Sequence, residues 1–168
     1  WRAESLRGTG TLRGGVLRLE EVSARSGDLT LEDVALVLPL QESRMEVSGR
    51  FEKLRLEDLP IEAASGIPGL LSGRVEAVLA DRTDIARGLT AHALLDAGHL
   101  YGLAFRQVEL SVSGADSFWT ADSLRAELEG ASLEAEGDFG PAALDLRLRY
   151  RGDIRPLRPF VKNETLAG

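Results

Sequence analysis

The chain has 168 residues, 43% of them hydrophobic, and is therefore long and apolar enough to fold around a core. It carries 20 Lys and Arg against 27 Asp and Glu, a net charge of −7, which argues against nucleic-acid binding because phosphate contacts need a basic face. It has no cysteine, which excludes disulfides and thiolate metal sites, and no apolar run approaches the roughly 20 residues of a membrane-spanning helix.

The chain opens on Trp1-Arg2-Ala3-Glu4, without an initiator Met or a signal peptide. Both ends look cut. We expect a piece of a longer protein whose membrane anchor and termini lie elsewhere.

Bulky apolar residues alternate with other residues along most of the chain, which is typical of strands with one apolar face. In chain order, the alternation is clearest at 29–31, 34–38, 103–105 and 144–150. The abundant Leu, Ala, Glu and Arg favour helix by propensity, but the two-residue period indicates strand. We therefore predict an all-β fold of about a dozen antiparallel strands of roughly 7–10 residues in meander order.

Glycine and proline mark the interruptions of this pattern. Glycines lie between alternating runs and are expected at turns or bulges; they are Gly14, Gly15, Gly27, Gly49, Gly114, Gly130 and Gly137. Pro60 to Leu71 holds two prolines and two glycines, and the sequence predicts a loop or one short helix there.

A short motif recurs five times: two apolar residues one position apart, two mostly polar residues, then another such apolar pair. A polar pair inside a strand would turn the second half to the opposite face, unless a turn or bulge restores the side. Such bends would also curl the sheet. The five copies start at Leu17, Leu29, Leu54, Leu103 and Trp119.

A longer repeat overlays this motif. Leu59-Pro60-Ile61 is echoed 95 residues later by Ile154-Arg155-Pro156-Leu157, and Leu71-Ser72-Gly73 by Leu166-Ala167-Gly168. We expect residues 1–58 to end one unit, 59–153 to form a full unit of about 95 residues, and 154–168 to begin the next, all within one continuous β-domain.

Several of these patterns are similar to the AsmA/TamB family of bacterial envelope proteins. They are the step Asp58-Leu59-Pro60, the strand opening Leu71 to Val75 and the run Leu133 to Phe139. The run Ala121 to Gly130 makes the resemblance slightly closer to TamB. The resemblance implies a long sheet bent into a U-shaped, taco-like groove with an apolar interior.

The family resemblance also implies a location and partners. Proteins of this family are anchored in the inner membrane and cross the periplasm, where they are implicated in moving phospholipid to the outer membrane. TamB also acts in outer-membrane protein assembly with a barrel partner. Here any anchor or barrel partner would engage regions outside this chain.

The residues alone leave two architectures open: a groove, or a closed sandwich or barrel whose halves cover each other. Aromatic residues are only 5%, and a lining of Leu, Val and Ala suits acyl chains, which need burial without directional contacts. With the family resemblance, the groove is favoured. The residues expected to line it together are Leu29, Leu31, Leu36, Val75, Leu79, Phe105, Val108, Leu110, Leu124, Leu128, Leu133, Leu146 and Leu148.

Residues for catalysis or metal binding are sparse. His92 and His99 flank an expected turn at Asp96-Ala97-Gly98, and a surface role is favoured over a metal pair across a hairpin. Acidic pairs such as Glu32-Asp33 lack the ligand spacing of a calcium loop, and no nucleophile motif is present. We expect no enzyme, no cofactor and no metal.

Three functions remain as hypotheses: a phospholipid conduit segment, a scaffold that templates outer-membrane strands through a sheet edge, and a closed structural β-domain.

Overall fold

The computed structural model describes residues 4–58, 68–84, 87–100, 103–115, 118–140 and 143–155, and within them the fold is all-β. The helical element described in full is the three-residue 3₁₀ turn η1, and no helix described is long and apolar enough to cross a membrane. The elements are β1 (Ser5–Arg13), β2 (Val16–Ser26), β3 (Leu29–Pro39), β4 (Met45–Arg55), η1 (Leu56–Asp58), β5 (Gly69–Leu79), β6 (Leu89–Leu95), β7 (Gly98–Leu100), β8 (Leu103–Ala115), β9 (Phe118–Leu128), β10 (Ala131–Gly140) and β11 (Ala143–Gly152).

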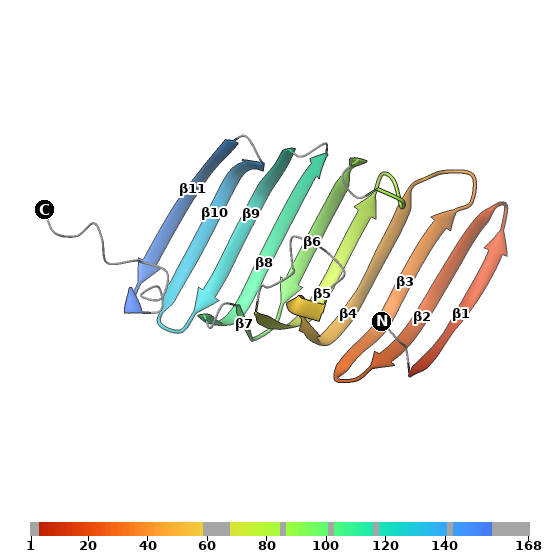
Figure 1. The fold of residues 1–168 in the computed structure, drawn as a ribbon, viewed down its shortest axis with the longest axis horizontal. Helices are drawn as coiled ribbons and strands as arrows, with labels where there is room; N and C mark the ends of the chain where they lie inside the picture. The colour runs from red at the N-terminus through yellow and green to blue at the C-terminus, as the bar shows by residue number, and fades with distance from the viewer. Residues whose placement is uncertain are drawn as a thin grey trace, which may run out of the picture.

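The strands form one antiparallel sheet in meander order, as predicted (Figure 1). Consecutive strands pair with each other, except that β6 and β7 do not pair and β8 pairs with both of them. β6 and β7 share one position: both lie between β5 and β8, where Gly73 faces Leu95 and Leu70 faces His99. β5 and β8 each pair with both β6 and β7, so β6 and β7 together act as one interrupted strand with two neighbours.

This interruption corrects the expected turn at residues 96–98. The chain keeps its direction from β6 to β7, and the Asp96 N–H donates to the Ser72 carbonyl at 2.8 Å. His92 therefore lies beside Glu76 and Ser111, and His99 beside Leu70 and Ala104, in separate parts of the strand.

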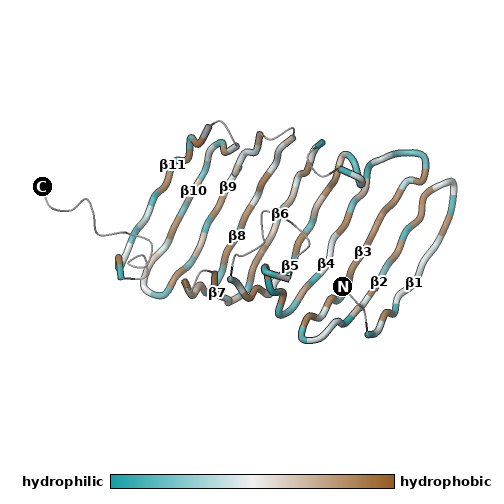
Figure 2. The backbone as a smooth tube through the Cα atoms, in the orientation of Figure 1, coloured by the Kyte–Doolittle hydropathy of each residue, from teal (hydrophilic) through white to brown (hydrophobic). Residues whose placement is uncertain are grey.

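The strand register places apolar residues side by side across the whole sheet. Figure 2 shows hydropathy alternating along the strands. One row of paired residues reads Leu6, Ala24, Leu31, Phe51, Gly73, Leu95, Val108, Ala126, Leu133 and Tyr150. A second row reads Gly10, Leu19, Leu36, Val47, Ala77, Ala91, Val112, Ala121, Gly137 and Leu146. We call the surface that these rows share the apolar face.

β-Bulges at polar pairs keep this face continuous, as the repeated motif predicts. Glu21 and Asp33 have positive φ values of 53° and 52°, and each lies at a register shift between neighbouring strands. Further shifts occur at Arg106-Gln107 and Asp122-Ser123. The extra residue in each bulge restores the alternation, so side chains before and after it face the same side. In β3, Leu31 before the bulge and Val34 after it therefore both lie on the apolar face.

The third copy of the motif is different. Its polar pair, Glu57-Asp58, lies in η1. The bulge in β4 lies instead at the preceding polar pair, Glu52-Lys53, where Lys53 has a φ of 57°. The loop or helix expected over residues 60–71 is also corrected in part, because Gly69 to Leu71 already belong to β5. Residues 59–67 lie outside the described residues.

Glycines occupy two kinds of position, turns and strand interiors. Gly14, Gly15, Gly27 and Gly130 lie in turns with positive φ. Gly49, Gly114 and Gly137 lie inside strands instead. There the missing side chain allows a close neighbour: a Cβ at Gly114 would come within 2.6 Å of the Phe118 carbonyl oxygen.

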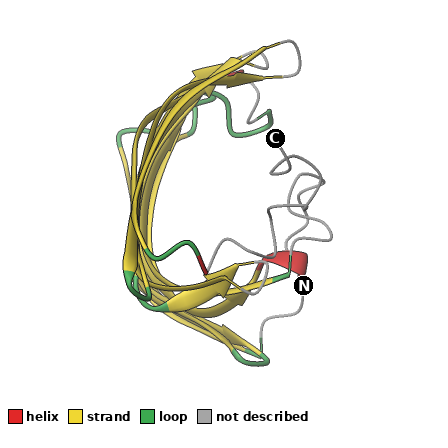
Figure 3. Ribbon diagram, turned by 90° about the vertical axis from the view of Figure 1, so that its left-hand side faces the viewer, coloured by secondary structure: helices red, strands yellow, loops and turns green. Residues whose placement is uncertain are grey.

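Viewed along the sheet, the described strands follow an arc (Figure 3). The bulges and the in-strand glycines explain this curvature, because a bulge bends its strand and a glycine lets strands approach closely on the inner side.

Candidate functional site

The apolar face extends over all ten strand positions of the described sheet. A third row on it contains Met45, Leu79, Leu89, Gly114, Trp119, Phe139 and Leu144, and a fourth contains Gly49, Val75, Ala93, Leu110, Leu124, Ala135 and Leu148. Every member of these rows is apolar or glycine. Apart from the Tyr150 hydroxyl and the Trp119 indole N–H, the face offers burial without side-chain hydrogen-bond partners.

All thirteen residues singled out from the sequence lie on this one face. Ten of them belong to the four rows, and Phe105 and Leu128 pair with each other in the next row. Leu29 lies two residues before Leu31 in β3 and shares its side of the strand. The structure therefore brings the whole predicted set together, while its binding role stays a prediction.

The apolar face is most strongly buried near one end of the strands. Leu29, Phe51, Leu71, Phe105, Ala126 and Leu128 form a cluster there, and Leu128 is only 5% exposed. The described strands make a single sheet, so no second sheet covers these side chains. We infer that they are buried because the arc turns the apolar face inward and brings neighbouring side chains together.

η1 supports this assignment of the inner side. Leu56 of η1 packs against the apolar cluster, and Figure 3 shows η1 on the concave side of the arc. The backbone N–H groups of Glu57 and Gly69 lower the pKa of the Glu57 carboxyl group, and the Gly69 N–H lies 3.3 Å from Glu57 Oε2. This contact ties η1 to the first residue of β5, at one end of the apolar face.

The opposite face of the sheet, which we call the polar face, carries cross-strand ion pairs. Arg147 lies 2.8 Å from Glu136, and Arg149 lies 3.4 Å from Glu134. Each pair joins β10 to β11 between residues that face one another in the register. These side chains are solvated, so the pairs contribute little to stability and chiefly mark this face as the water side.

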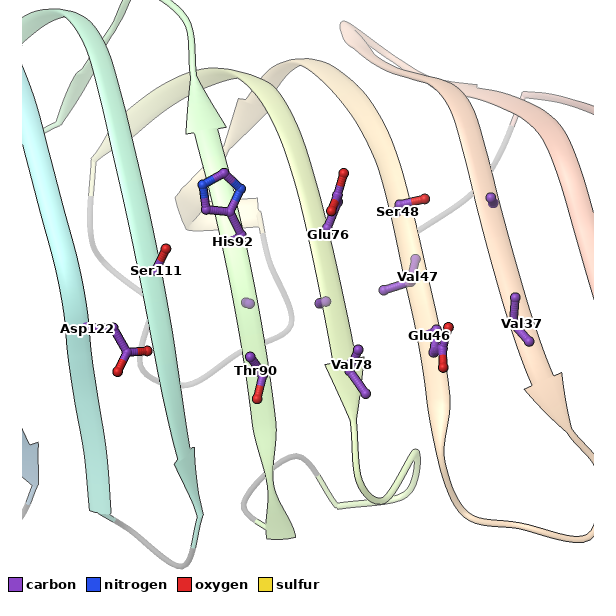
Figure 4. Close-up of a pocket in the computed structure, with 13 residues that line it drawn as sticks. Val37, Glu46, Val47, Ser48, Glu76, Val78, Thr90, His92, Ser111 and Asp122 are labelled. Carbon is purple, nitrogen blue, oxygen red and sulfur yellow. The ribbon is translucent and has the colours of Figure 1, made fainter.

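An open depression of about 440 Å³ lies on the polar face across β3 to β9 (Figure 4). Glu76, His92 and Ser111 line it from neighbouring strands. His92 Nε2 lies 3.4 Å from Glu109 Oε1, so the imidazole already has a carboxylate partner. Among the residues that the structure describes, no group of three or more His, Asp or Glu side chains is arranged to hold a metal ion.

One carboxylate is held within a turn. Asp81, buried between β5 and β6, accepts hydrogen bonds from the Thr83 hydroxyl at 2.7 Å and from the Thr83 N–H at 3.0 Å. These bonds lower the pKa of Asp81, with smaller help from Arg87 and Arg82. They close the turn before β6, which is a structural role.

Comparison of the chain with protein-family models, with curated proteins and with solved structures gives no match.

Proposed function

We propose that the apolar face forms a groove that binds phospholipid acyl chains, and that the chain is a segment of a lipid conduit between the membranes of the bacterial envelope. The observation that carries this proposal is the continuity of the apolar rows across ten strand positions of a single sheet. A soluble protein rarely leaves so large an apolar surface without a partner.

The composition of the face favours hydrocarbon over a specific small ligand. Ligand pockets combine apolar walls with a few placed polar groups. The four rows present Leu, Val, Ala, Gly and a few bulky residues, with no charged side chain and a single hydroxyl, that of Tyr150 at the edge of the sheet. Such a surface can hold a flexible acyl chain in many positions, as movement along it requires.

The envelope location rests on the resemblance to the AsmA/TamB family. In the proposed setting, the segment lies in the periplasm, within a protein anchored to the inner membrane, and phospholipid moves along the sheet from strand to strand. An outer-membrane barrel partner would bind elsewhere in that protein.

Lipid extraction and photo-crosslinking test the proposal. Mass spectrometry of the purified protein should detect co-purifying phospholipid. A photo-crosslinking amino acid at Leu110 or at Leu128 should label lipid, whereas the same probe at Ser111 should not, because Ser111 follows Leu110 in β8 and lies on the polar face. The absence of lipid from the protein, or equal labelling at Leu110 and Ser111, would contradict the proposal.

A further inference from the structure

The two ends of the apolar face, taken along the strands, differ in how far the protein itself covers them. At one end, Leu71, Phe105 and Leu128 of the apolar cluster are 9%, 7% and 5% exposed, and Leu56 of η1 packs against this cluster. We call this the cluster end. Its side chains already fill one another's surroundings, so it leaves little apolar surface for a ligand and no access for water.

The opposite end, which we call the loop end, is where the third row meets the turns at 40–44 and 80–84. From β4 to β10 the members of this row are only half-buried. The ring of Trp119 lies over Gly114, because a Cβ on that glycine would come within 2.6 Å of Trp119 Cε3. Tryptophan suits a boundary between apolar surface and water, since its ring is apolar and its N–H is polar.

The half-buried part of the face between these ends has the length of one acyl chain. Along β9 it runs from Trp119 through Ala121 to Leu124, and Ala126 already belongs to the apolar cluster. The five residue steps from Trp119 to Leu124 cover about 17 Å of strand. One acyl chain spans about 15 Å, half of a membrane's hydrocarbon core. A chain laid along the strand therefore fits between the loop end and the cluster.

The turns at the loop end carry an arginine that can bind a phosphate group. Arg44 and Arg87 already pair with neighbouring carboxylates, at 2.8 and 3.4 Å. Arg82 is exposed and makes no ion pair with a residue that the structure describes. Its N–H donates to the Ser43 carbonyl at 2.8 Å, which fixes its backbone between two turns. A guanidinium group placed in this way suits an anionic headgroup.

We propose, on the basis of the lipid-binding groove proposed above, that each phospholipid lies along the strands, with its phosphate at the loop end and the methyl ends of its acyl chains toward the cluster end. The phosphate needs water and a cation, and the loop end offers both. The acyl chains need only apolar surface, and they end where the protein's own side chains fill the face. Arg82 contacts the phosphate of a lipid on β5 and β6, and Trp119 lies beside the glycerol of a lipid on β8 and β9. Movement from strand to strand then keeps every headgroup at the same end.

Fluorescence quenching tests this orientation. The chain has two tryptophans, so Trp1→Phe leaves Trp119 as the single emitter. This variant is loaded with phosphatidylcholine that carries bromine either beside the glycerol or at the methyl ends of its chains. The first lipid should quench Trp119 about two-fold more strongly, because the two bromine positions lie about 15 Å apart. With Trp1→Phe, Trp119→Phe and Leu133→Trp combined, the order should reverse, since Leu133 packs against the apolar cluster. Equal quenching of Trp119 by both lipids, or stronger quenching by the methyl-end bromine, would overturn the orientation.

Binding of two lipids that differ only in the headgroup tests the phosphate contact. Arg82→Ala should weaken binding of phosphatidylcholine about three- to ten-fold, as expected for one charge-assisted hydrogen bond, and leave binding of diacylglycerol unchanged. Arg106→Ala is the matched control, because Arg106 is exposed near the cluster end, and it should change neither. Unchanged binding of phosphatidylcholine by Arg82→Ala, or equal weakening for both lipids, would overturn the headgroup position.

Failure of this orientation is distinguishable from failure of the groove itself. A protein that binds neither lipid would contradict both. Lipid that binds and quenches Trp119 in the wrong order, or not at all, would contradict the orientation alone.

Discussion

Gly49 of β4 lies against Val34 of β3, where a Cβ on Gly49 would come within 2.8 Å of Val34 Cγ2 and 3.1 Å of Val34 Cα. Val34 directly follows the bulged residue Asp33, so the glycine stands opposite the bend. Gly8 and Val22 repeat the arrangement beside the Glu21 bulge, with Val22 Cα 3.0 Å from the position of a Cβ. The curvature of the sheet thus depends on a bulge in one strand and a glycine in the next.

Gly49→Ala should lower the free energy of unfolding by about 1–3 kcal/mol, because the added methyl group meets backbone that cannot move without flattening the bend. Urea denaturation measures this change. Gly10→Ala is the control: its Cβ would meet the flexible tip of Leu19 at 3.0 Å, with no backbone atom nearer than 3.8 Å, so its cost should be smaller. Equal costs for the two variants would contradict this account of the curvature.

Leu128→Ala should destabilise the protein by about 2–4 kcal/mol, since Leu128 is 5% exposed in the apolar cluster and its removal leaves a cavity. Leu148→Ala, on the same face but at the sheet edge, should change stability by less than about 1 kcal/mol because that side chain is mostly solvated already. Chemical denaturation of both variants checks the contrast. Similar losses would contradict the difference in burial between the apolar cluster and the edge of the same face.

Leu110→Arg should reduce the phospholipid that co-purifies with the protein about ten-fold, because a guanidinium group beside an acyl chain loses its hydration. The sheet should remain folded, since Arg can extend its charged end to water from a half-buried position. Quantitative lipid mass spectrometry and circular dichroism measure the two effects, and transport in cells should fail. Ser111→Arg should retain the lipid; a matching loss there would indicate a general effect of charge.

Thr83→Val should raise the pKa of Asp81 toward its ordinary value, because the Thr83 hydroxyl is the strongest influence that lowers this pKa. A lowered folded-state pKa stabilises the fold above the pKa of Asp in the unfolded chain, and this stabilisation is lost as the pH falls through the folded pKa. The difference in free energy of unfolding between the wild-type protein and Thr83→Val should therefore be largest at neutral pH and disappear in acid. Carboxyl NMR titration and denaturation across pH measure this, and a wild-type Asp81 that titrates like an unfolded-chain Asp would refute it.

The alternation of side chains was sufficient to predict the meander and the composition of the apolar face. Residues such as Leu29, Val108 and Leu146 could be assigned to one face because the two-residue period and the polar pairs can be read locally. The β4 bulge at Lys53 was missed because the third motif copy was assigned to the polar pair Glu57-Asp58. Phe51-Glu52-Lys53-Leu54 carries the same pattern as the other bulged segments and could have indicated it.

The expected turn between His92 and His99 was wrong for a different reason. Asp96-Ala97-Gly98 is a typical turn sequence, yet turn residues also suit a break within a strand. Pairing of Leu70 with His99 and of Leu103 with Leu100 holds β7 in the same position as β6, and no local signal reports these long-range partners.

The amino-acid sequence by itself determined which side chains share a face of the sheet. In a strand, successive side chains point to opposite faces, and only an extra residue at a bulge changes this alternation. Only the tertiary structure decided that the strands follow an arc, that glycines such as Gly49 face the bends, and that β6 and β7 share one strand position. Those features arise from the packing and pairing of residues distant in the chain, and the periodicity of a single strand carries no information about its neighbours.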